Sequence, residues 1–157
     1  MLGSLGLRTA PGLWRDRAFL AALAGGSVIA LALGNVAAPD GGHFVNGSAR
    51  FMAGWLAAQS LLEELFFRGV VYGWLGGRLW AMRKVLGVSP VNWFASALFV
   101  AAHLLSQPAL WAVAVLAPSL VFGHFRERYG SLLPPMVLHL SYNAAFFLGP
   151  AGVLRLS

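Results

Sequence analysis

Residues 18–39 form an apolar run of 22 residues that contains no charged side chain. At about 1.5 Å per residue, a helix of this length spans roughly 30 Å, the thickness of the hydrocarbon core of a bilayer. Because lipid offers no hydrogen-bond partners, a segment that crosses it is expected to be helical. Only 10% of the whole chain is charged, against about 25% in soluble domains. An integral membrane protein is therefore expected, rather than a soluble enzyme or a disordered chain.

Four further apolar stretches follow, at residues 51–80, 91–105, 108–125 and 132–148. Together with the first run they predict an all-α, polytopic transmembrane helix bundle of about five to six helices. The count depends on residues 51–80, which give one long helix, or two if the chain breaks near Gly69. We expect Pro118 to kink the fourth stretch. We expect residues 1–157 to form a single membrane-embedded domain, with the functional motifs at about 55–148.

The basic residues gather in loops that five spans would place on one side of the membrane. They are the three arginines of residues 8–17, the pair at 83–84 and the pair at 126–128. The positive-inside rule then predicts a cytoplasmic N-terminus and an external C-terminus. The net charge of +6 accordingly indicates contact with anionic lipid, and we expect no nucleic-acid partner. A signal peptide ending at residues 36–38 is the alternative for the first run, but Pro39 directly after the cleavage position disfavours it.

Residues 61–68 of the second apolar stretch contain three charged residues, and each charge within a membrane costs at least about 2.5 kcal/mol on insertion scales. Glu64 and Arg68 are four residues apart, so they share one helix face and can form an ion pair. Glu63 is rotated by about 100° from Glu64 and has no such charged partner within the helix. A carboxylate without a partner in a medium of low dielectric can take up and release a proton. The alternative interpretation is a structural ion cluster that joins helices.

Two other apolar stretches carry polar side chains at helical spacing. Phe99 and His103 lie on one face of their stretch. His139 and Asn143 lie one turn apart on the last stretch. A single buried histidine is usually a hydrogen-bonded core residue. Together with Glu63, however, these residues could supply the base, the water-orienting group and the oxyanion donors that amide hydrolysis by activated water requires.

The sequence excludes several other hydrolase sites that occur in membranes. The chain contains no cysteine, no His-Glu-x-x-His zinc motif and no Gly-x-Ser-x-Gly motif. Its aspartates, Asp16 and Asp40, lie outside the apolar stretches, so an aspartyl dyad within the membrane is excluded. A site built from glutamate and histidine remains.

Taken in chain order, the polar residues of these three apolar stretches resemble the three sequence motifs of the CPBP family. These are the CAAX proteases and bacteriocin-processing enzymes, which are also labelled abortive-infection proteins. The matching residues are Glu63-Glu64-x-x-x-Arg68, Phe99-x-x-x-His103 and His139-x-x-x-Asn143. The resemblance extends over about residues 55–148, and the polar turn at residues 126–135 before the third motif is similar as well. Each motif alone is short, but all three in order within an apolar chain are specific.

The resemblance implies a glutamic-type intramembrane endopeptidase. Glu63 and His103 would activate the water, and His139 and Asn143 would stabilise the oxyanion. The supporting residues would be Glu64, Arg68 and Phe99. We expect no cofactor. The alternative is a zinc-dependent CAAX-type metalloprotease, whose metal ligands would be Glu63, His103 and His139.

The resemblance also implies a membrane-anchored protein or peptide as the substrate. The chain is short and lacks the additional helices of the eukaryotic CAAX enzymes, which disfavours a prenylated substrate. We therefore expect a multi-pass protein of the bacterial inner membrane that cleaves a leader or a C-terminal sorting segment, as in the JDVT-type system. The alternatives are a non-catalytic, peptide-binding immunity protein and a proton-coupled transporter. The lack of an internal repeat disfavours the transporter.

Overall fold

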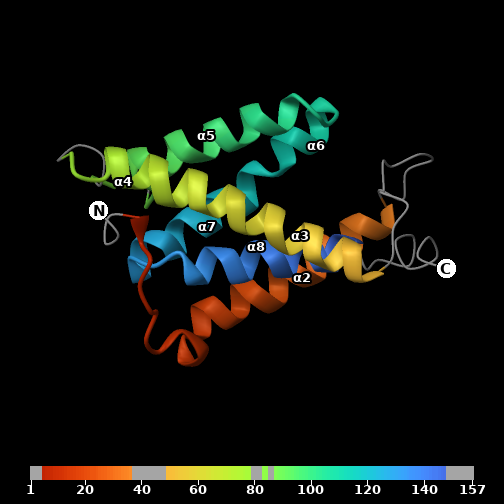
Figure 1. The fold of residues 1–157 in the computed structure, drawn as a ribbon, viewed down its shortest axis with the longest axis horizontal. Coiled ribbons are helices and arrows are strands. Elements are labelled where there is room, and N and C mark those ends of the chain that lie inside the picture. The colour runs from red at the N-terminus through yellow and green to blue at the C-terminus, as the bar shows by residue number, and fades with distance from the viewer. Residues whose placement is uncertain (1–4, 37–48, 79–82, 85–86, 148–157) are drawn as a thin grey trace.

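The computed structural model describes residues 5–36, 49–78, 83–84 and 87–147. All regular elements of these residues are helical, which confirms the predicted all-α class. The elements are η1 (Leu13–Arg15), α2 (Arg17–Val36), α3 (Ala49–Glu64), η2 (Leu65–Val71), α4 (Tyr72–Leu75), α5 (Pro90–Leu104), α6 (Ala109–Ala114), α7 (Leu116–Tyr129) and α8 (Leu133–Phe147). Among the described residues they group into five rods, namely α2, α3 to α4, α5, α6 to α7, and α8 (Figure 1). Three predicted stretches have ends outside the described residues, at 37–39, 79–80 and 148.

Helix α3 continues through η2 into α4 without a break, so residues 49–75 form one helical rod. One long helix in this stretch is therefore confirmed as far as Leu75, with no break at Gly69. The segment η2 is a π-helix that begins directly after Glu64 and contains Arg68. A π-turn changes the rotation of the residues that follow it, and such turns are frequent at functional sites.

The predicted kink at Pro118 takes the form of an interruption between α6 and α7. Pro118 has no backbone N–H to donate to the carbonyl of Ala114, four residues earlier, and its ring crowds that carbonyl. Helix α6 ends at Ala114, and α7 begins at Leu116, after the single residue Val115. The proline therefore divides one apolar stretch into two helices.

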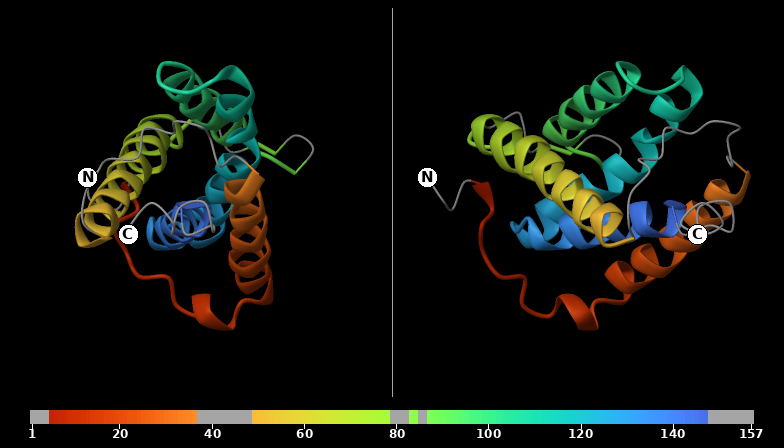
Figure 2. Two further views of the ribbon diagram at one scale, coloured as in Figure 1. Left: turned by 90° about the vertical axis from the view of Figure 1, so that its right-hand side faces the viewer. Right: turned by 45° about the vertical axis from the view of Figure 1, so that its right-hand side comes forward.

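Helix α8, which carries the third motif, lies between α2 and α3 (Figures 1 and 2). Small residues of α2 allow the two helices to approach closely. A side chain at Gly26 would collide with the ring of Tyr142, and one at Gly34 would collide with the backbone of Phe146. Helix α8 also contacts α7, and α5 packs against both α7 and η2. The three motif segments therefore meet in the middle of the bundle.

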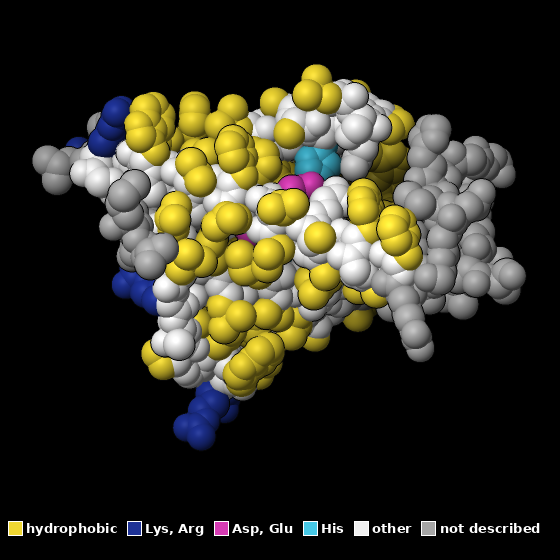
Figure 3. Space-filling view, in the orientation of Figure 1, with side chains coloured by type: hydrophobic (Ala, Val, Ile, Leu, Met, Phe, Trp, Pro, Cys, Tyr) yellow, Lys and Arg dark blue, Asp and Glu magenta, His cyan; other side chains and the backbone are white. Residues whose placement is uncertain are grey.

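The outer surface of the bundle carries many apolar side chains, as a surface facing lipid requires (Figure 3). Large exposed apolar residues include Ile29, Trp74 and Leu110. Within the residues that the structure describes, two helices could cross a membrane by length and composition, Arg17–Val36 and Ala109–Tyr129, of which the second joins α6 and α7. Helix α5 is a shorter apolar helix. These features agree with a membrane helix bundle.

Candidate active site

The motif segments meet where α3 passes into η2, beside α5 and α8. Glu64 is fully buried, and its Oε1 atom accepts two hydrogen bonds. One comes from Nη1 of Arg68 at 2.9 Å, and the other comes from Nδ1 of His139 at 2.8 Å. The predicted ion pair of Glu64 and Arg68 is therefore confirmed. His139, which belongs to the third motif, is bonded to the same oxygen atom of Glu64 and so connects the third motif to this ion pair.

Arg68 is also fully buried, and its further polar contacts come from α7. Its Nη2 atom donates to the Oγ atom of Ser119 at 2.6 Å and to the backbone carbonyl of the same residue at 2.9 Å. The guanidinium lies 4.9 Å from the ring centre of Phe99 and 5.4 Å from that of Phe122, within the range of cation–π contacts. A buried charge requires a counter-charge and hydrogen bonds. Arg68 has both, which explains its place inside an apolar bundle.

The imidazole of His139 is held by aromatic rings as well as by Glu64. Its ring stacks on that of Phe122, with centroids 5.0 Å apart, and meets that of Phe99 edge-on at 5.7 Å. Its Nε2 atom lies 3.6 Å from Oε2 of Glu63. His139 is thus hydrogen-bonded to one of the two adjacent carboxylates and close to the other.

The two adjacent glutamates differ in exposure, since the side chain of Glu63 is 21% exposed and that of Glu64 is fully buried. The Oε1 atom of Glu63 accepts a hydrogen bond of 2.9 Å from Nε2 of Gln59, one turn earlier in α3. The sequence predicts no charged partner for Glu63 within its own helix. The structure agrees, since the partner of Glu63 in α3 is the neutral amide of Gln59. Sequence reasoning missed Gln59, although its spacing of four residues from Glu63 is a signal for such a bond.

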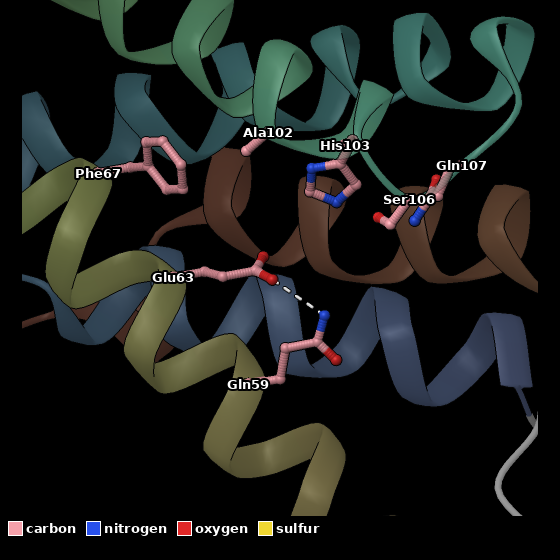
Figure 4. A pocket seen from close by; sticks show the side chains of 7 residues that line it. All are labelled: Gln59, Glu63, Phe67, Ala102, His103, Ser106 and Gln107. Carbon is pink, nitrogen blue, oxygen red and sulfur yellow. Dashed lines mark hydrogen bonds between the residues drawn. The ribbon is translucent and has the colours of Figure 1, made fainter.

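Glu63 and His103 line the same cavity, from two different helices (Figure 4). The cavity has a volume of about 140 Å³, and its other lining residues are Gln59, Phe67, Ala102, Ser106 and Gln107. Nδ1 of His103 lies 2.9 Å from the backbone carbonyl oxygen of Phe99. Because a carbonyl only accepts hydrogen bonds, Nδ1 carries a proton, and Nε2 is an acceptor in the neutral ring. The cavity therefore brings a carboxylate and an imidazole to one space that can hold water.

Asn143 lies one turn beyond His139 on α8, as its spacing predicts, but it is not among the residues that line the cavity. Its Nδ2 atom donates at 3.2 Å to Oγ of Ser60 in α3. The other predicted residues form one connected cluster around Glu64 and the cavity. They are Glu63, Glu64, Arg68, Phe99, His103 and His139.

Among the described residues, no group of three or more histidine, cysteine, aspartate or glutamate side chains is placed to hold a metal ion. The alternative zinc ligands, Glu63, His103 and His139, do not form such a group. The Nδ1 atom of each histidine is bonded to Glu64 or to a backbone carbonyl, an arrangement that orients the ring and leaves Nε2 as the nitrogen that could bind a ligand.

Comparison with known proteins identifies the family. Residues 45–145, well over half of the chain, match the family model described as type II CAAX prenyl endopeptidase Rce1-like. No curated protein and no solved structure matches the chain. The match includes all three motifs and confirms the resemblance to the CAAX proteases, which are membrane-embedded hydrolases of peptide bonds. The chain therefore belongs to the Rce1-like family of type II CAAX prenyl endopeptidases.

Proposed function

We propose that this CAAX-type protease is a glutamic-type intramembrane endopeptidase, in which Glu63 activates the attacking water. The observation that carries the proposal is the cavity that Glu63 shares with His103. Of the two adjacent glutamates, Glu64 is engaged in a buried ion pair, whereas Glu63 reaches the cavity and is held there by a neutral amide. Glu63 is therefore the carboxylate that can accept a proton from water.

In the proposed reaction, a water molecule in the cavity gives a proton to Glu63 while its oxygen attacks the carbonyl carbon of the scissile bond. The electron pair of the carbonyl moves to its oxygen and forms a tetrahedral oxyanion. His103 orients the water, because its Nε2 atom accepts a hydrogen bond from the second water proton. Glu63 then gives its proton to the leaving nitrogen as the C–N bond breaks. The products are a carboxyl group and an amine.

His139 and Asn143 are the proposed donors to the oxyanion. The bond from Nδ1 of His139 to Glu64 fixes the ring and presents Nε2 on the side of Glu63. This Nε2 atom donates when the ring carries a proton on both nitrogens. Asn143 has to exchange its bond to Ser60 for one to the oxyanion, through a rotation of its side chain.

The supporting residues act through the two histidines. The ion pair of Glu64 and Arg68 holds His139 in place. The ring of Phe99 contacts both imidazoles, at centroid distances of 4.3 Å from His103 and 5.7 Å from His139. The proposed mechanism uses no metal cofactor, because Glu63 cannot readily serve as both a metal ligand and the base.

The proposed substrate is a membrane-anchored peptide without a prenyl group, either a leader or a C-terminal sorting segment of the JDVT type. We also propose that the chain is a multi-pass protein of the bacterial inner membrane, with five spans and a cytoplasmic N-terminus. Its Lys and Arg side chains lie toward one end of the molecule on the face that Figure 3 shows, which supports this orientation.

The test is a cleavage assay in proteoliposomes against a panel of membrane-anchored peptides, with products identified by mass spectrometry. The panel contains leader segments, C-terminal sorting segments and a prenylated CAAX peptide. Wild type is compared with Glu63→Gln, which preserves the shape of the side chain but removes the base. The matched control is Glu127→Gln, since Glu127 contacts Tyr72 and Ser89 and does not line the cavity. Each protein is assayed with and without a chelator.

We expect wild type and Glu127→Gln to cleave an unprenylated peptide in the presence of the chelator, and Glu63→Gln to lose at least about 10²-fold in rate. Cleavage by Glu63→Gln at the wild-type rate would refute Glu63 as the base. Cleavage that the chelator abolishes and zinc restores would make Glu63, His103 and His139 metal ligands instead. Binding of a peptide without cleavage by wild type would favour the immunity protein.

A further inference from the structure

We propose that Gln59 is a positioning residue, which holds the carboxylate of Glu63 in the orientation that water activation needs. The inference rests on the proposed function, because it gives Gln59 a part in the same reaction. Gln59 belongs to none of the three motifs.

The contact between the two side chains is direct. Gln59 lies one turn before Glu63 on α3, and both line the cavity (Figure 4). Nε2 of Gln59 donates to Oε1 of Glu63 at 2.9 Å. The Oε2 atom of Glu63 is buried and has no hydrogen-bond partner in the described part of the chain, since Nε2 of His139 is 3.6 Å away. Among the described residues, the Gln59 amide is thus the group that fixes the rotation of this carboxylate by a hydrogen bond.

An amide is well suited to this task. A carboxylate oxygen has two acceptor positions, so Oε1 of Glu63 can bind the Gln59 amide and a water molecule together. The amide is neutral, so it holds the carboxylate of Glu63 without forming an ion pair with it, whereas the guanidinium of Arg68 holds Glu64 in a buried ion pair. Fixing one rotamer of a flexible side chain reduces the entropy that is lost when base, water and peptide bond come together.

A purely structural role makes a different prediction. A hydrogen-bonded pair at this spacing stabilises an isolated helix only slightly, so its loss would lower stability slightly and leave turnover unchanged. A residue that positions the base lowers kcat and leaves KM nearly unchanged, because it acts in the transition state and not on the bound peptide. The two roles can therefore be separated by kinetics.

The kinetic test replaces the donor while it keeps the size of the side chain. Gln59→Met has a similar length and helix propensity but cannot donate, and Gln59→Glu places an acceptor at the same position. The control is Leu62→Met, which introduces methionine at an exposed position of the same helix. With a peptide that wild type cleaves, we expect Gln59→Met to lower kcat by about 10- to 100-fold with a KM within about two-fold. Gln59→Glu should be slower still, because two carboxylates repel, and Leu62→Met should match wild type.

A spectroscopic test does not depend on activity. The infrared difference between wild type and Glu63→Gln isolates the carboxylate stretching bands of Glu63. The infrared difference between Gln59→Met and the double variant Gln59→Met/Glu63→Gln isolates the carboxylate bands of Glu63 in a protein that lacks the amide donor. A shift in frequency between the two differences supports the contact, and identical bands overturn the inference.

Failure of this inference and failure of the proposed function have different signatures. Wild-type kcat in Gln59→Met beside an inactive Glu63→Gln would overturn the role of Gln59 and leave the proposed function standing. A raised KM at unchanged kcat would also overturn it, because Gln59 would then bind the peptide. Full activity of Glu63→Gln would refute the proposed function, and the positioning role would fall with it.

Discussion

Nδ1 of His139 lies 2.8 Å from Oε1 of Glu64, inside the bundle, although the two residues are 75 positions apart in the chain. Both side chains are buried. The same oxygen of Glu64 also accepts the hydrogen bond from Arg68. The bond between His139 and Glu64 connects the third motif to the first. The position of His139 beside Glu63 therefore depends on Glu64, a carboxylate that does not line the cavity.

We expect Glu64→Gln to destabilise the protein by about 3–5 kcal/mol, because the buried guanidinium of Arg68 would lose its counter-charge. The measurement is denaturant-induced unfolding in detergent. Glu63→Gln is the matched comparison, since Glu63 is partly exposed and forms no ion pair with a Lys or Arg side chain in the part of the chain that the structure describes; its basic neighbour there is the imidazole of His139, at 3.6 Å. We expect its stability to remain within about 1 kcal/mol of wild type. Equal losses in the two variants would contradict the division into a structural and a reactive glutamate.

Contacts within one helix could be predicted from the sequence, because helical spacing fixes which side chains share a face. The ion pair of Glu64 and Arg68 and the contact of Phe99 with His103 are of this kind. The interruption of the helix before Pro118 also follows from local chemistry. These elements account for most of the site that the motifs indicate.

Contacts between helices could not be predicted in the same way. The spacing places Asn143 one turn from His139, but the neighbour that each side chain meets depends on how α8 is rotated. That rotation is set by packing against α2, where Gly26 and Gly34 permit close approach. The π-helix after Glu64 could not be predicted either, because the spacing of residues in an α-helix gives no sign of it. The contact of Asn143 with Ser60 therefore emerges only in three dimensions.

His103 should be required for turnover but not for folding. We expect His103→Gln to lower kcat by about 10²- to 10⁴-fold, because the water loses the group that orients it. The half-buried ring contributes little to the core, so the unfolding temperature should change by only a few degrees. His124→Gln is the matched control, because His124 is exposed on α7 and does not line the cavity. An active His103→Gln enzyme would remove His103 from the mechanism.

If Asn143 donates a hydrogen bond to the oxyanion, substitutions of Asn143 and of its hydrogen-bond partner Ser60 should have different effects on kcat. We expect Asn143→Ala to lower kcat by about 10²- to 10³-fold, whereas Ser60→Ala should leave kcat unchanged because Ser60 takes no part in the reaction. Both variants lose the same hydrogen bond of 3.2 Å, so their stabilities can be compared directly. Similar losses of stability with wild-type kcat in both would make the role of Asn143 structural.

Ser119 should contribute to the stability of the buried arginine. Ser119→Ala removes the hydroxyl that accepts from Arg68 at 2.6 Å but keeps the backbone carbonyl. We expect a loss of about 1.5–3 kcal/mol, the range for hydrogen bonds to charged groups. Ser96→Ala is the control, because Ser96 accepts from the Ser119 hydroxyl and does not contact the arginine. It should cost less than Ser119→Ala, and the reverse order would contradict the assigned contact.

Asp16 should make the stability of the protein depend on pH at the start of the first membrane helix. Its carboxylate accepts hydrogen bonds from the hydroxyl of Tyr129 at 2.7 Å and from the backbone N–H of Ala18 at 2.9 Å, and it forms an ion pair with Nε of Arg128 at 2.9 Å. These contacts, with the Tyr129 hydroxyl as the largest, hold the pKa of Asp16 below its ordinary value.

Because the pKa of Asp16 is lower in the folded state than its value of about 3.9 in an unfolded chain, the carboxylate stabilises the fold above that pH. The contribution is lost as the pH falls toward the folded-state pKa. We expect Asp16→Asn to lower the unfolding temperature in detergent at pH 7 and to have a smaller effect at pH 3. Tyr129→Phe should reduce the same pH dependence, since it removes the largest cause of the lowered pKa. If Asp16→Asn had the same effect at both pH values, the loss would come from the geometry of the helix start and not from the charge.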